Sequence, residues 1–398
     1  MDITIQPRKL QGRITAIPSK SQAHRLLICA AFADRPTALR CPETNRDITA
    51  TAECLRALGA SVVRTADGYT VRPIGKLPEK AELPCCESGS TLRFLLPIVG
   101  ALGVNTTFRM EGRLPERPLS PLWEEMERMG CTLTRPTSDT IRCTGKLRSG
   151  HYTIDGGISS QFITGLLYAL SLIPGGGRLE ITGKIESRPY IEMTRKAMKT
   201  FGVSTENNIL TGQDRYISPG CMTVEGDWSN GAFFLAAQAL GSAITVDNLD
   251  PASPQGDRAV ADLLPRLEKS LTIDAADIPD LVPILAVAAA AKKGAVFTSI
   301  GRLRIKESDR VAAVIAMLKA LGGHAHADAD TLTVEAAALT GGTVDARNDH
   351  RIAMAAAIAA TVCTKPVTIL GAQCTEKSYP AFWEEYKRLG GLYEQHLR

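Results

Sequence analysis

The strongest constraint in the sequence is a pattern that occurs six times, in which a short polar or cationic segment runs directly into a strongly apolar stretch. The first case is SKSQAHR at residues 19–25, followed by the apolar residues 26–32. The other polar segments are ESGSTLR (87–93), SSQ (159–161), DWSN (227–230), IPD (278–280) and NDHR (348–351). A helix that is apolar on every side must be buried, while the free N–H groups of its first turn attract anions. We therefore expect six buried helices whose polar starts carry the chemistry.

A second, amphipathic type of helix alternates with the buried type and usually ends in a glycine that leads into a strand. Such segments lie at 47–63, 121–133, 190–205, 257–273, 308–327 and 382–394, and the fourth of them lacks the glycine. The glycine supplies a left-handed C-cap. Six such units in 398 residues predict two similar domains of three units each. The fold class is α/β in a mixed α+β arrangement, with buried helices surrounded by sheets.

Strand pairing and a domain border can also be predicted. Residues 61–73 and 132–145 alternate in polarity around turn formers, which is typical of hairpins. The helix–strand order adds parallel pairs. Turn formers in residues 207–226, among them Pro219 and Gly220, separate the third unit from the fourth. We expect the chain to enter its second half near Glu225.

Composition excludes several classes of protein. Lys plus Arg number 46 against 42 for Asp plus Glu, so no global field attracts nucleic acid or a membrane surface. The N-terminus has no signal-peptide core, and the longest apolar run, residues 281–291, is too short to span a bilayer. The ten cysteines include no C-x-x-C pair, which favours reduced thiols. We expect a cytoplasmic protein without nucleic-acid or membrane partners.

Cations gather at the helix starts and in the loops. Lys20, Arg25, Arg93, His350 and Arg351 lie at helix starts, and the loops add Arg113, Arg117, Lys306, Arg310 and Lys377. Ordinary N-caps at Ser159, Ser160, Ser229 and Asp280, with solvated arginines, are the alternative for any single position. Several phosphate-binding groups at one helix start favour anion binding instead.

Carboxylates are interleaved with these cations. Asp280, Glu307 and Asp349 each lie near a basic residue or at the head of an apolar helix, which suits proton transfer among anionic substrates. Structural ion pairing is the alternative for Asp349. His324 and His326 have no third ligand nearby, and no H-E-x-x-H, G-x-S-x-G or Rossmann motif occurs. The sequence predicts group transfer between anions without a metal or cofactor.

The whole chain resembles the 5-enolpyruvylshikimate-3-phosphate synthase family of enolpyruvyl transferases. The resemblance rests on ten motifs in order: SKSQAHR, GSTLRF, GRLPERP, DGGISSQFITGLL, ESRPYIEMT, EGDWSNGAFF, IPDLVPI, KESDR, NDHRIAM and CTEKSYP. It implies two domains, each of three βαβαββ units. It also implies that the N-terminal strand belongs to the C-terminal domain. The expected domains are therefore residues 1–18 with 226–398, on the phosphoenolpyruvate side, and residues 19–225, with the shikimate 3-phosphate cradle.

The resemblance implies transfer of the enolpyruvyl group of phosphoenolpyruvate to shikimate 3-phosphate, a step of the shikimate pathway towards chorismate and aromatic amino acids. The shikimate 3-phosphate contacts would be Lys20, Ser21, Arg25, Ser159, Ser160, Gln161, Ser187, Asp280 and Lys306. The phosphoenolpyruvate contacts would be Lys20, Gly89, Arg117, Gln161, Arg310, Arg351 and Lys377. A monomer is implied as well.

The resemblance also implies the catalytic roles. Asp280 would accept the proton of the 5-hydroxyl group, and Glu307 would protonate the methylene carbon of phosphoenolpyruvate, with Lys377 as a rival for that step. Lys20 would contact both substrates. Many members carry Asn-Ala-Gly-Thr where this chain has residues 87–90 (ESGS), in the segment that the resemblance assigns to the phosphoenolpyruvate and glyphosate pocket. Arg302 replaces an Asn of several members and is not expected to contact the ligand.

Two alternatives remain. The sister enzyme that acts on UDP-N-acetylglucosamine carries a cysteine in the loop before its Arg-Pro, and residues 109–118 contain none. A non-enzymatic sensor of phosphorylated metabolites would have lost its catalytic carboxylates, whereas Asp280 and Glu307 are both present. Phosphate release with each acceptor discriminates among the three.

Overall fold

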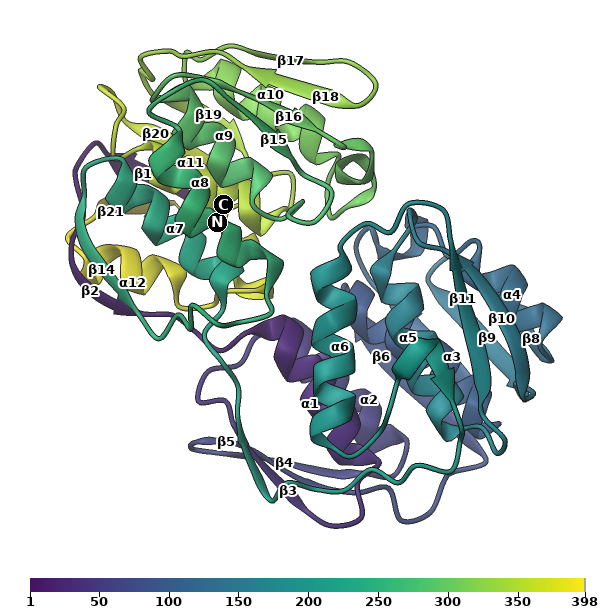
Figure 1. The fold of residues 1–398 in the computed structure, drawn as a ribbon. Helices are drawn as coiled ribbons and strands as arrows, with labels where there is room; N and C mark the ends of the chain where they lie inside the picture. Colours follow the sequence, from purple (N-terminus) through teal and green to yellow (C-terminus); the bar gives the residue numbers. More distant parts are fainter. Residues whose placement is uncertain (397–398) are drawn as a thin grey trace. The chain divides into compact units, whose positions relative to one another are not determined.

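The computed structural model describes residues 1–396, which form two compact units. Unit 1 comprises Met1–Ser19 together with the chain from Glu225 onward, and unit 2 comprises Lys20–Val224. The chain passes between the units twice, after Ser19 and after Val224. Each unit is built from buried helices surrounded by three sheets (Figure 1).

Unit 2 has three buried helices and three partly exposed ones. The buried helices are α1 (Lys20–Ala31), α3 (Gly89–Leu102) and α5 (Ser160–Leu172). The others are α2 (Arg46–Ala57), α4 (Leu122–Arg128) and α6 (Arg188–Thr200). The first sheet has the order β13 (Cys221–Thr223), β3 (Thr37–Arg40), β5 (Gly68–Arg72), β4 (Ser61–Thr65). The second has the order β6 (Lys80–Cys86), β7 (Asn105–Met110), β9 (Thr140–Gly145), β8 (Cys131–Thr134), and the third β10 (Gly150–Asp155), β11 (Gly177–Thr182), β12 (Ile209–Leu210).

Unit 1 follows the same plan. Its buried helices are α7 (Trp228–Ala239), α9 (Val282–Ala290) and α11 (His350–Ala359). Its other helices are α8 (Val260–Arg266), α10 (Arg310–Ala320) and α12 (Phe382–Arg388). One sheet has the order β15 (Leu271–Asp274), β16 (Ala295–Thr298), β18 (Thr331–Val334), β17 (Ala325–Ala327). The others are β19 (Gly342–Asp345), β20 (Val367–Leu370), β1 (Asp2–Gln6), β21 (Leu392–His396), and the pair β14 (Ala243–Asp247) and β2 (Gln11–Thr15).

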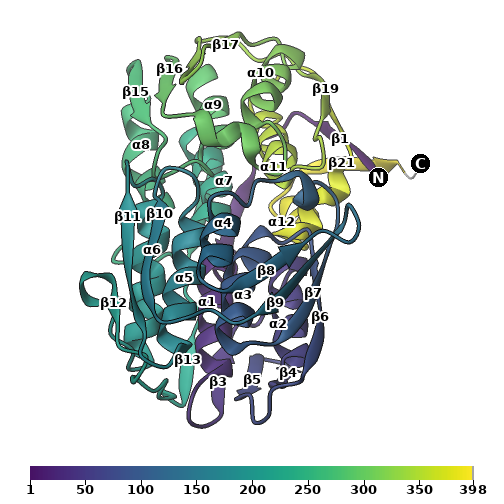
Figure 2. The same ribbon diagram turned by 90° about the vertical axis from the view of Figure 1, so that its right-hand side faces the viewer.

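The repeat predicted from the sequence is visible in the strand order. In unit 2 the chain runs β6-α3-β7-α4-β8-β9, and in unit 1 it runs β15-α9-β16-α10-β17-β18. Both sheets place the first two strands in parallel and the last two as an antiparallel hairpin. The hairpins predicted at 61–73 and 132–145 are confirmed as β4–β5 and β8–β9. The mixed class with helices inside sheets is correct, and Figure 2 shows the same arrangement from the side.

The first strand of the chain lies in the same sheet as the last. β1 pairs antiparallel with β20, where Ile3 faces Ile369, and with β21, where Ile5 faces Tyr393. Ile3 and Ile5 are fully buried in this sheet. The pairing places both ends of the described chain in unit 1.

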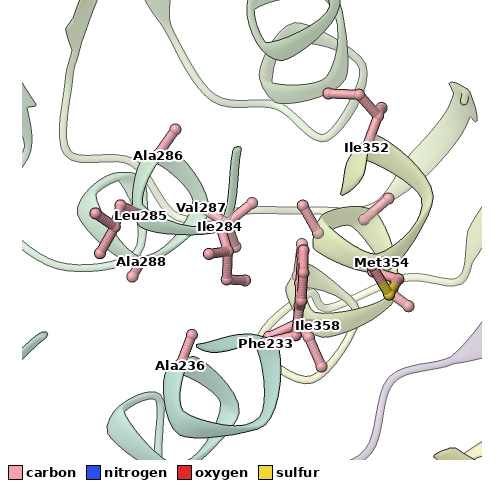
Figure 3. Packing of buried hydrophobic residues seen from close by; sticks show 14 of the residues in the cluster. Phe233, Ala236, Ile284, Leu285, Ala286, Val287, Ala288, Ile352, Met354 and Ile358 are labelled. Atoms are coloured by element: carbon pink, nitrogen blue, oxygen red, sulfur yellow. The ribbon is translucent and has the colours of Figure 1, made fainter. Parts of the chain in front are cut away.

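The core of unit 1 shows why its helices are apolar on every side. Every residue of α9 is buried, and α9 contacts both α7 and α11. Figure 3 shows Phe233 of α7, Ile284 of α9 and Ile358 of α11 pointing into the space that the three helices share. Pro283 fits in α9 because the first turn has no internal partner for its missing N–H. Despite this apolarity, no helix within residues 1–396 is long and apolar enough to cross a membrane.

Candidate active site

In unit 2 the starts of α1 and α2 lie together. Lys20 Nζ donates to Asp47 Oδ2 at 2.9 Å, joining the first turns of the two helices. One turn later, His24 Nδ1 and Thr51 Oγ1 are 2.7 Å apart. Two contacts in register, each one turn apart, show that the helices run in parallel. Lys20 is therefore held at a helix start by a carboxylate from its neighbour.

The second of these contacts continues into α3. Thr51 Oγ1 lies 2.7 Å from Thr91 Oγ1, which donates to Ser88 Oγ at 2.7 Å. Because Thr91 gives its hydrogen to Ser88, Thr51 must donate to Thr91 and accept from His24 Nδ1–H. Burial lowers the pKa of His24 to about 3, so the ring is neutral and this tautomer is fixed. The chain of hydrogen bonds sets the register of three helix starts.

The starts of α3 and α5 are joined through Gln161. Arg93 Nη1 donates to Gln161 Oε1 at 2.8 Å, and Gln161 Nε2 donates to Ser90 Oγ at 2.9 Å. Ser159 caps α5 by accepting from the backbone N–H of Gln161 at 3.3 Å, and Ser160 is buried beside it. Ser159 is thus an N-cap, as the simpler alternative held. Its neighbours nevertheless present several anion-binding groups at one end of the unit.

Arg25 ties α1 to α6. Its Nε donates to Thr194 Oγ1 at 2.9 Å and its Nη2 donates to the carbonyl of Tyr190 at 2.8 Å. Its guanidinium also lies 5.1 Å from the centre of the Phe94 ring. Ser187, the buried residue before α6, has φ of 55°, an uncommon backbone conformation for serine. Strain of this kind occurs often at functional sites.

Two arginines converge over Gly89, the first residue of α3. A Cβ atom added to Gly89 would lie 2.7 Å from Arg117 Nη1 and 3.3 Å from Arg93 Nη1. The glycine therefore leaves room for both guanidinium groups against the free N–H groups of the helix start. Two cations and a helix N-terminus favour a phosphate or carboxylate group at this position.

In unit 1, one buried arginine bridges three carboxylates. Arg310 donates from Nε to Asp349 Oδ2 at 2.9 Å, from Nη1 to Asp280 Oδ1 at 2.6 Å, and from Nη2 to Glu307 Oε2 at 2.6 Å. Its side chain is only 1% exposed. The three predicted carboxylates are therefore brought together, although they are far apart in the sequence. A buried arginine is stable only because its charge is fully paired.

Asp280 carries further cationic partners. Arg351 Nη2 donates to Asp280 Oδ2 at 3.1 Å, and Lys306 Nζ lies 3.8 Å from Oδ1. Burial alone would raise the pKa of Asp280, but Arg351, Lys306 and Arg310 outweigh it and hold the pKa well below its usual range. Burial also lowers the pKa of Lys306 to about 8, against the pull of Asp280, and nearby Arg302 adds to this effect.

The alternative that Asp280 and Ser229 are ordinary helix N-caps is wrong. Asp280 is not an N-cap, since α9 begins at Val282 and has no side-chain cap. Ser229 is not the cap of α7 either, because Asp227 accepts from Asn230 N–H at 2.8 Å. Asp349 both caps α11, accepting from Arg351 N–H at 3.0 Å, and pairs with Arg310. Structural ion pairing of Asp349 is therefore confirmed, and Asp349 also belongs to the cluster of carboxylates around Arg310.

Asp257 is a site residue that the sequence reasoning missed. It lies in the short 3-10 helix η3 (Gly256–Ala259) and is 2% exposed. Burial raises its pKa to about 7, the charge of Asp280 adds to the rise, and Arg351 opposes it. In the sequence, Asp257 follows the turn-forming segment 253–256 and begins the amphipathic helix expected at 257–273. Nothing in that pattern distinguishes it from a surface carboxylate.

The remaining residues are placed as follows. Lys377 is buried at the end of the 3-10 helix η5 (Ala372–Lys377). Arg113 is a surface residue that pairs with Glu116 at 3.4 Å. His326 is exposed on β17, and within residues 1–396 no three His, Cys, Asp or Glu side chains form a group that could hold a metal ion. The proposed substrate contacts thus fall into two groups. Lys20, Ser21, Arg25, Gly89, Arg117, Ser159, Ser160, Gln161 and Ser187 lie in unit 2, and the others lie in unit 1.

Known proteins match the chain along nearly its whole length. The family model described as EPSP synthase (3-phosphoshikimate 1-carboxyvinyltransferase) matches residues 5–275 and 265–386. A 3-phosphoshikimate 1-carboxyvinyltransferase from Clostridium kluyveri is 37% identical over 415 residues, covering 98% of this chain and 97% of that relative. One from Clostridium beijerinckii is 37% identical over 429 residues, covering 99% and 98%.

Solved structures share the fold. The EPSP synthase of Acinetobacter baumannii superposes with a TM-score of 0.81 at 23% identity, covering 99% of this chain and 100% of that one. The enolpyruvyl transferase NikO from Streptomyces tendae superposes with a TM-score of 0.75 at 19% identity, covering 99% and 98%. The two structures establish the fold, while the family model and the clostridial relatives establish the sequence family. The chain belongs to the EPSP synthase family, whose description is 3-phosphoshikimate 1-carboxyvinyltransferase.

Proposed function

We propose that this chain transfers the enolpyruvyl group of phosphoenolpyruvate to the 5-hydroxyl group of shikimate 3-phosphate. The products are 5-enolpyruvylshikimate 3-phosphate and inorganic phosphate, a step of the shikimate pathway towards chorismate and aromatic amino acids. Membership of the family supports the reaction. The observation that carries the assignment of roles is that Asp280 and Glu307 share the guanidinium group of Arg310.

Shikimate 3-phosphate is assigned to the helix starts of unit 2. Ser159, Ser160 and Ser187 offer hydroxyl groups at the N-termini of α5 and α6, where the helix dipole favours a phosphate. Arg25 lies in the second turn of α1 and is oriented by α6. Lys20, Ser21 and Gln161 complete the set in unit 2. In unit 1, Asp280 and Lys306 are assigned to the hydroxyl side of the same substrate.

Phosphoenolpyruvate is assigned to the cations of both units. In unit 2 these groups are Lys20, Gln161, and Arg117 above Gly89. In unit 1 they are Arg310, Arg351 and Lys377, all of which are buried. Buried guanidinium groups bind an anion strongly because little water competes for them.

The proton steps follow from the carboxylates. Glu307, or its rival Lys377, gives a proton to the methylene carbon, which makes the adjacent carbon electrophilic. Asp280 takes the proton of the 5-hydroxyl group as its oxygen bonds to that carbon, giving a tetrahedral intermediate. The intermediate then loses phosphate, while the group that gave the first proton takes one back from the new methyl group. The cations stabilise the negative charge throughout.

The ion pairs of unit 1 link the basicity of Asp280 to substrate binding. Asp280 is a weak base while Arg310 and Arg351 are paired with it. An anionic substrate that takes over part of these hydrogen bonds raises the pKa of Asp280 towards the range of an effective base. Substrate binding therefore switches on the base.

The test is release of inorganic phosphate from phosphoenolpyruvate with shikimate 3-phosphate, run without added metal. UDP-N-acetylglucosamine serves as the alternative acceptor, and a reaction without acceptor is the blank. Release with shikimate 3-phosphate alone is the expected result. Release only with the sugar nucleotide would assign the sister reaction, and release with neither would overturn the proposed activity.

We propose further that the protein acts in the cytoplasm, where charged phosphorylated intermediates are retained, and that it acts as a monomer. Each unit has its own large hydrophobic core, so neither needs a second chain to bury its helices. Light scattering at micromolar concentration tests the monomer, and a dimeric mass would reject it.

A further inference from the structure

Arg117 lies on a loop, residues 111–118, that is attached to unit 2 at both ends. At its start, the N–H of Glu111 donates to the carbonyl of Cys86 at 2.7 Å. At its end, Arg93 Nη2 donates to the carbonyl of Pro118 at 3.0 Å. Between these points lies the single turn η1 (Leu114–Glu116), and the N–H of Arg117 bonds back to the carbonyl of Leu114 at 3.2 Å. The position of Arg117 therefore depends on how η1 is held.

Arg135 reaches η1 from outside the loop. It lies just beyond the end of β8, and its Nη1 donates to the carbonyl of Pro115 at 3.2 Å. This carbonyl is two residues from Arg117. By contrast, the ion pair between Arg113 and Glu116 is internal to the loop and attaches it to nothing else.

The guanidinium group of Arg135 is itself positioned by an aromatic ring. It lies 5.8 Å from the centre of the Trp123 ring on α4, within the range of a cation–π contact. Helix α4, which carries Trp123, contacts β8 (Figure 1), and Arg135 is the residue that follows β8. Together with the buried Leu119 and Leu133, they line an open hollow of about 580 Å³ beside the loop. The guanidinium group of Arg135 therefore lies over the Trp123 ring and also bonds to the carbonyl of Pro115.

We propose that Arg135 and Trp123 are positioning residues for the phosphoenolpyruvate contact of Arg117. They hold η1 so that the Arg117 guanidinium stays above Gly89, where Arg93 also lies. This inference rests on the proposed function, since it assigns a benefit to phosphoenolpyruvate binding. It makes a distinct claim, because neither residue touches the substrate: both act through the backbone of the loop.

The first test is steady-state kinetics of Arg135→Ala. A single hydrogen bond contributes modestly to stability, so we expect the KM for phosphoenolpyruvate to rise about 3- to 10-fold. The kcat and the KM for shikimate 3-phosphate should change by less than about 2-fold. Trp123→Ala should reproduce the effect, and Trp123→Phe, which keeps a ring face, should restore most of the affinity. The matched control is Arg142→Ala, which removes the same charge from an exposed position on the neighbouring strand β9.

Non-additivity identifies the route of the effect. If Arg135 acts through Arg117, adding Arg135→Ala to Arg117→Ala should raise the KM no further. An unchanged KM for phosphoenolpyruvate in active Arg135→Ala overturns the inference. So does an equal rise in Arg142→Ala, because the effect would then be one of net charge, and so does full additivity with Arg117→Ala.

Hydrogen exchange separates failure of this inference from failure of the proposed function. In substrate-free Arg135→Ala, the amides of residues 113–118 should exchange faster than in the wild type, while those of α5 remain unchanged. Unchanged exchange in residues 113–118 overturns the inference even where the enzyme is fully active. If the wild type releases no phosphate, the proposed function fails, and faster exchange alone still supports the role of Arg135 in holding the loop.

Discussion

Arg310 donates a 2.6 Å hydrogen bond to Asp280, so the proposed proton acceptor is paired with the cation proposed to bind phosphoenolpyruvate. One guanidinium group cannot serve the carboxylate and a substrate anion fully at the same time. Under the proposed roles, proton acceptance and anion binding are therefore coupled through these two side chains.

Replacing Asp280 by Asn should abolish turnover more than binding. The amide keeps the size of the side chain but cannot accept the hydroxyl proton, so we expect kcat to fall by about 10²- to 10⁴-fold. The dissociation constants of both substrates should change far less. Rapid-quench measurement of a single turnover, with equilibrium binding of each substrate, checks both parts.

Asp262→Asn is the matched control, because Asp262 is an exposed carboxylate on α8 of the same unit. It should retain wild-type kcat. Loss of substrate binding in Asp280→Asn with an unchanged rate for the bound complex would reject Asp280 as the base.

The pH dependence should report Lys306. Burial lowers the pKa of Lys306 to about 8, so the ammonium group is charged below that pH and becomes neutral above it. A cation assigned to shikimate 3-phosphate is thus lost on the alkaline side. We expect the KM for shikimate 3-phosphate to rise as the pH increases from 7.5 to 9.

Lys306→Arg provides the comparison, because arginine keeps its charge throughout this range. Its KM for shikimate 3-phosphate should be nearly independent of pH between 7.5 and 9, whatever its absolute value. If the alkaline rise persists unchanged in Lys306→Arg, another group causes it.

His24 should affect stability in a pH-dependent way. Its folded-state pKa of about 3 lies below the ordinary value of 6.5, so its contribution to stability is complete above pH 6.5 and is lost as pH falls below it. The loss should reach about 2 kcal/mol by pH 5. In urea unfolding, the stability advantage of the wild type over His24→Asn should shrink by that amount from pH 7 to pH 5. A gap independent of pH would show that the ring is not held neutral.

Much of the fold could be predicted because the signals are local. Apolar helices with polar starts and amphipathic helices ending in glycine appear directly in the sequence, and the structure has both types in each unit. The strand order of the two matching sheets also follows from the repeat. The pairing of β1 with β20 and β21 links residues at opposite ends of the chain, and no local pattern specifies it. That feature came from the family resemblance.

The site was predictable in its residue types and less so in its partners. The motifs supplied Asp280, Glu307, Arg310 and Asp349, but their convergence depends on three segments meeting in space. Asp257 was missed because a lone acidic residue after a turn usually faces water, whereas here it is buried beside Asp280. The anchoring of Lys20 by Asp47 was missed because it depends on the parallel packing of α1 and α2.

Gly89→Ala should weaken phosphoenolpyruvate binding without affecting shikimate 3-phosphate. The added Cβ would lie 2.7 Å from Arg117 Nη1, closer than such atoms approach, so the guanidinium group must move. The helix should tolerate the change, because the backbone of Gly89 is helical and alanine is a good helix former. We therefore expect a folded protein with a KM for phosphoenolpyruvate raised about 10-fold or more, and an unchanged KM for shikimate 3-phosphate. Gly301→Ala is the control, because a Cβ there would meet no atom within 4 Å. An unchanged KM for phosphoenolpyruvate in Gly89→Ala would mean that Arg117 does not bind the anion from the position it occupies above α3.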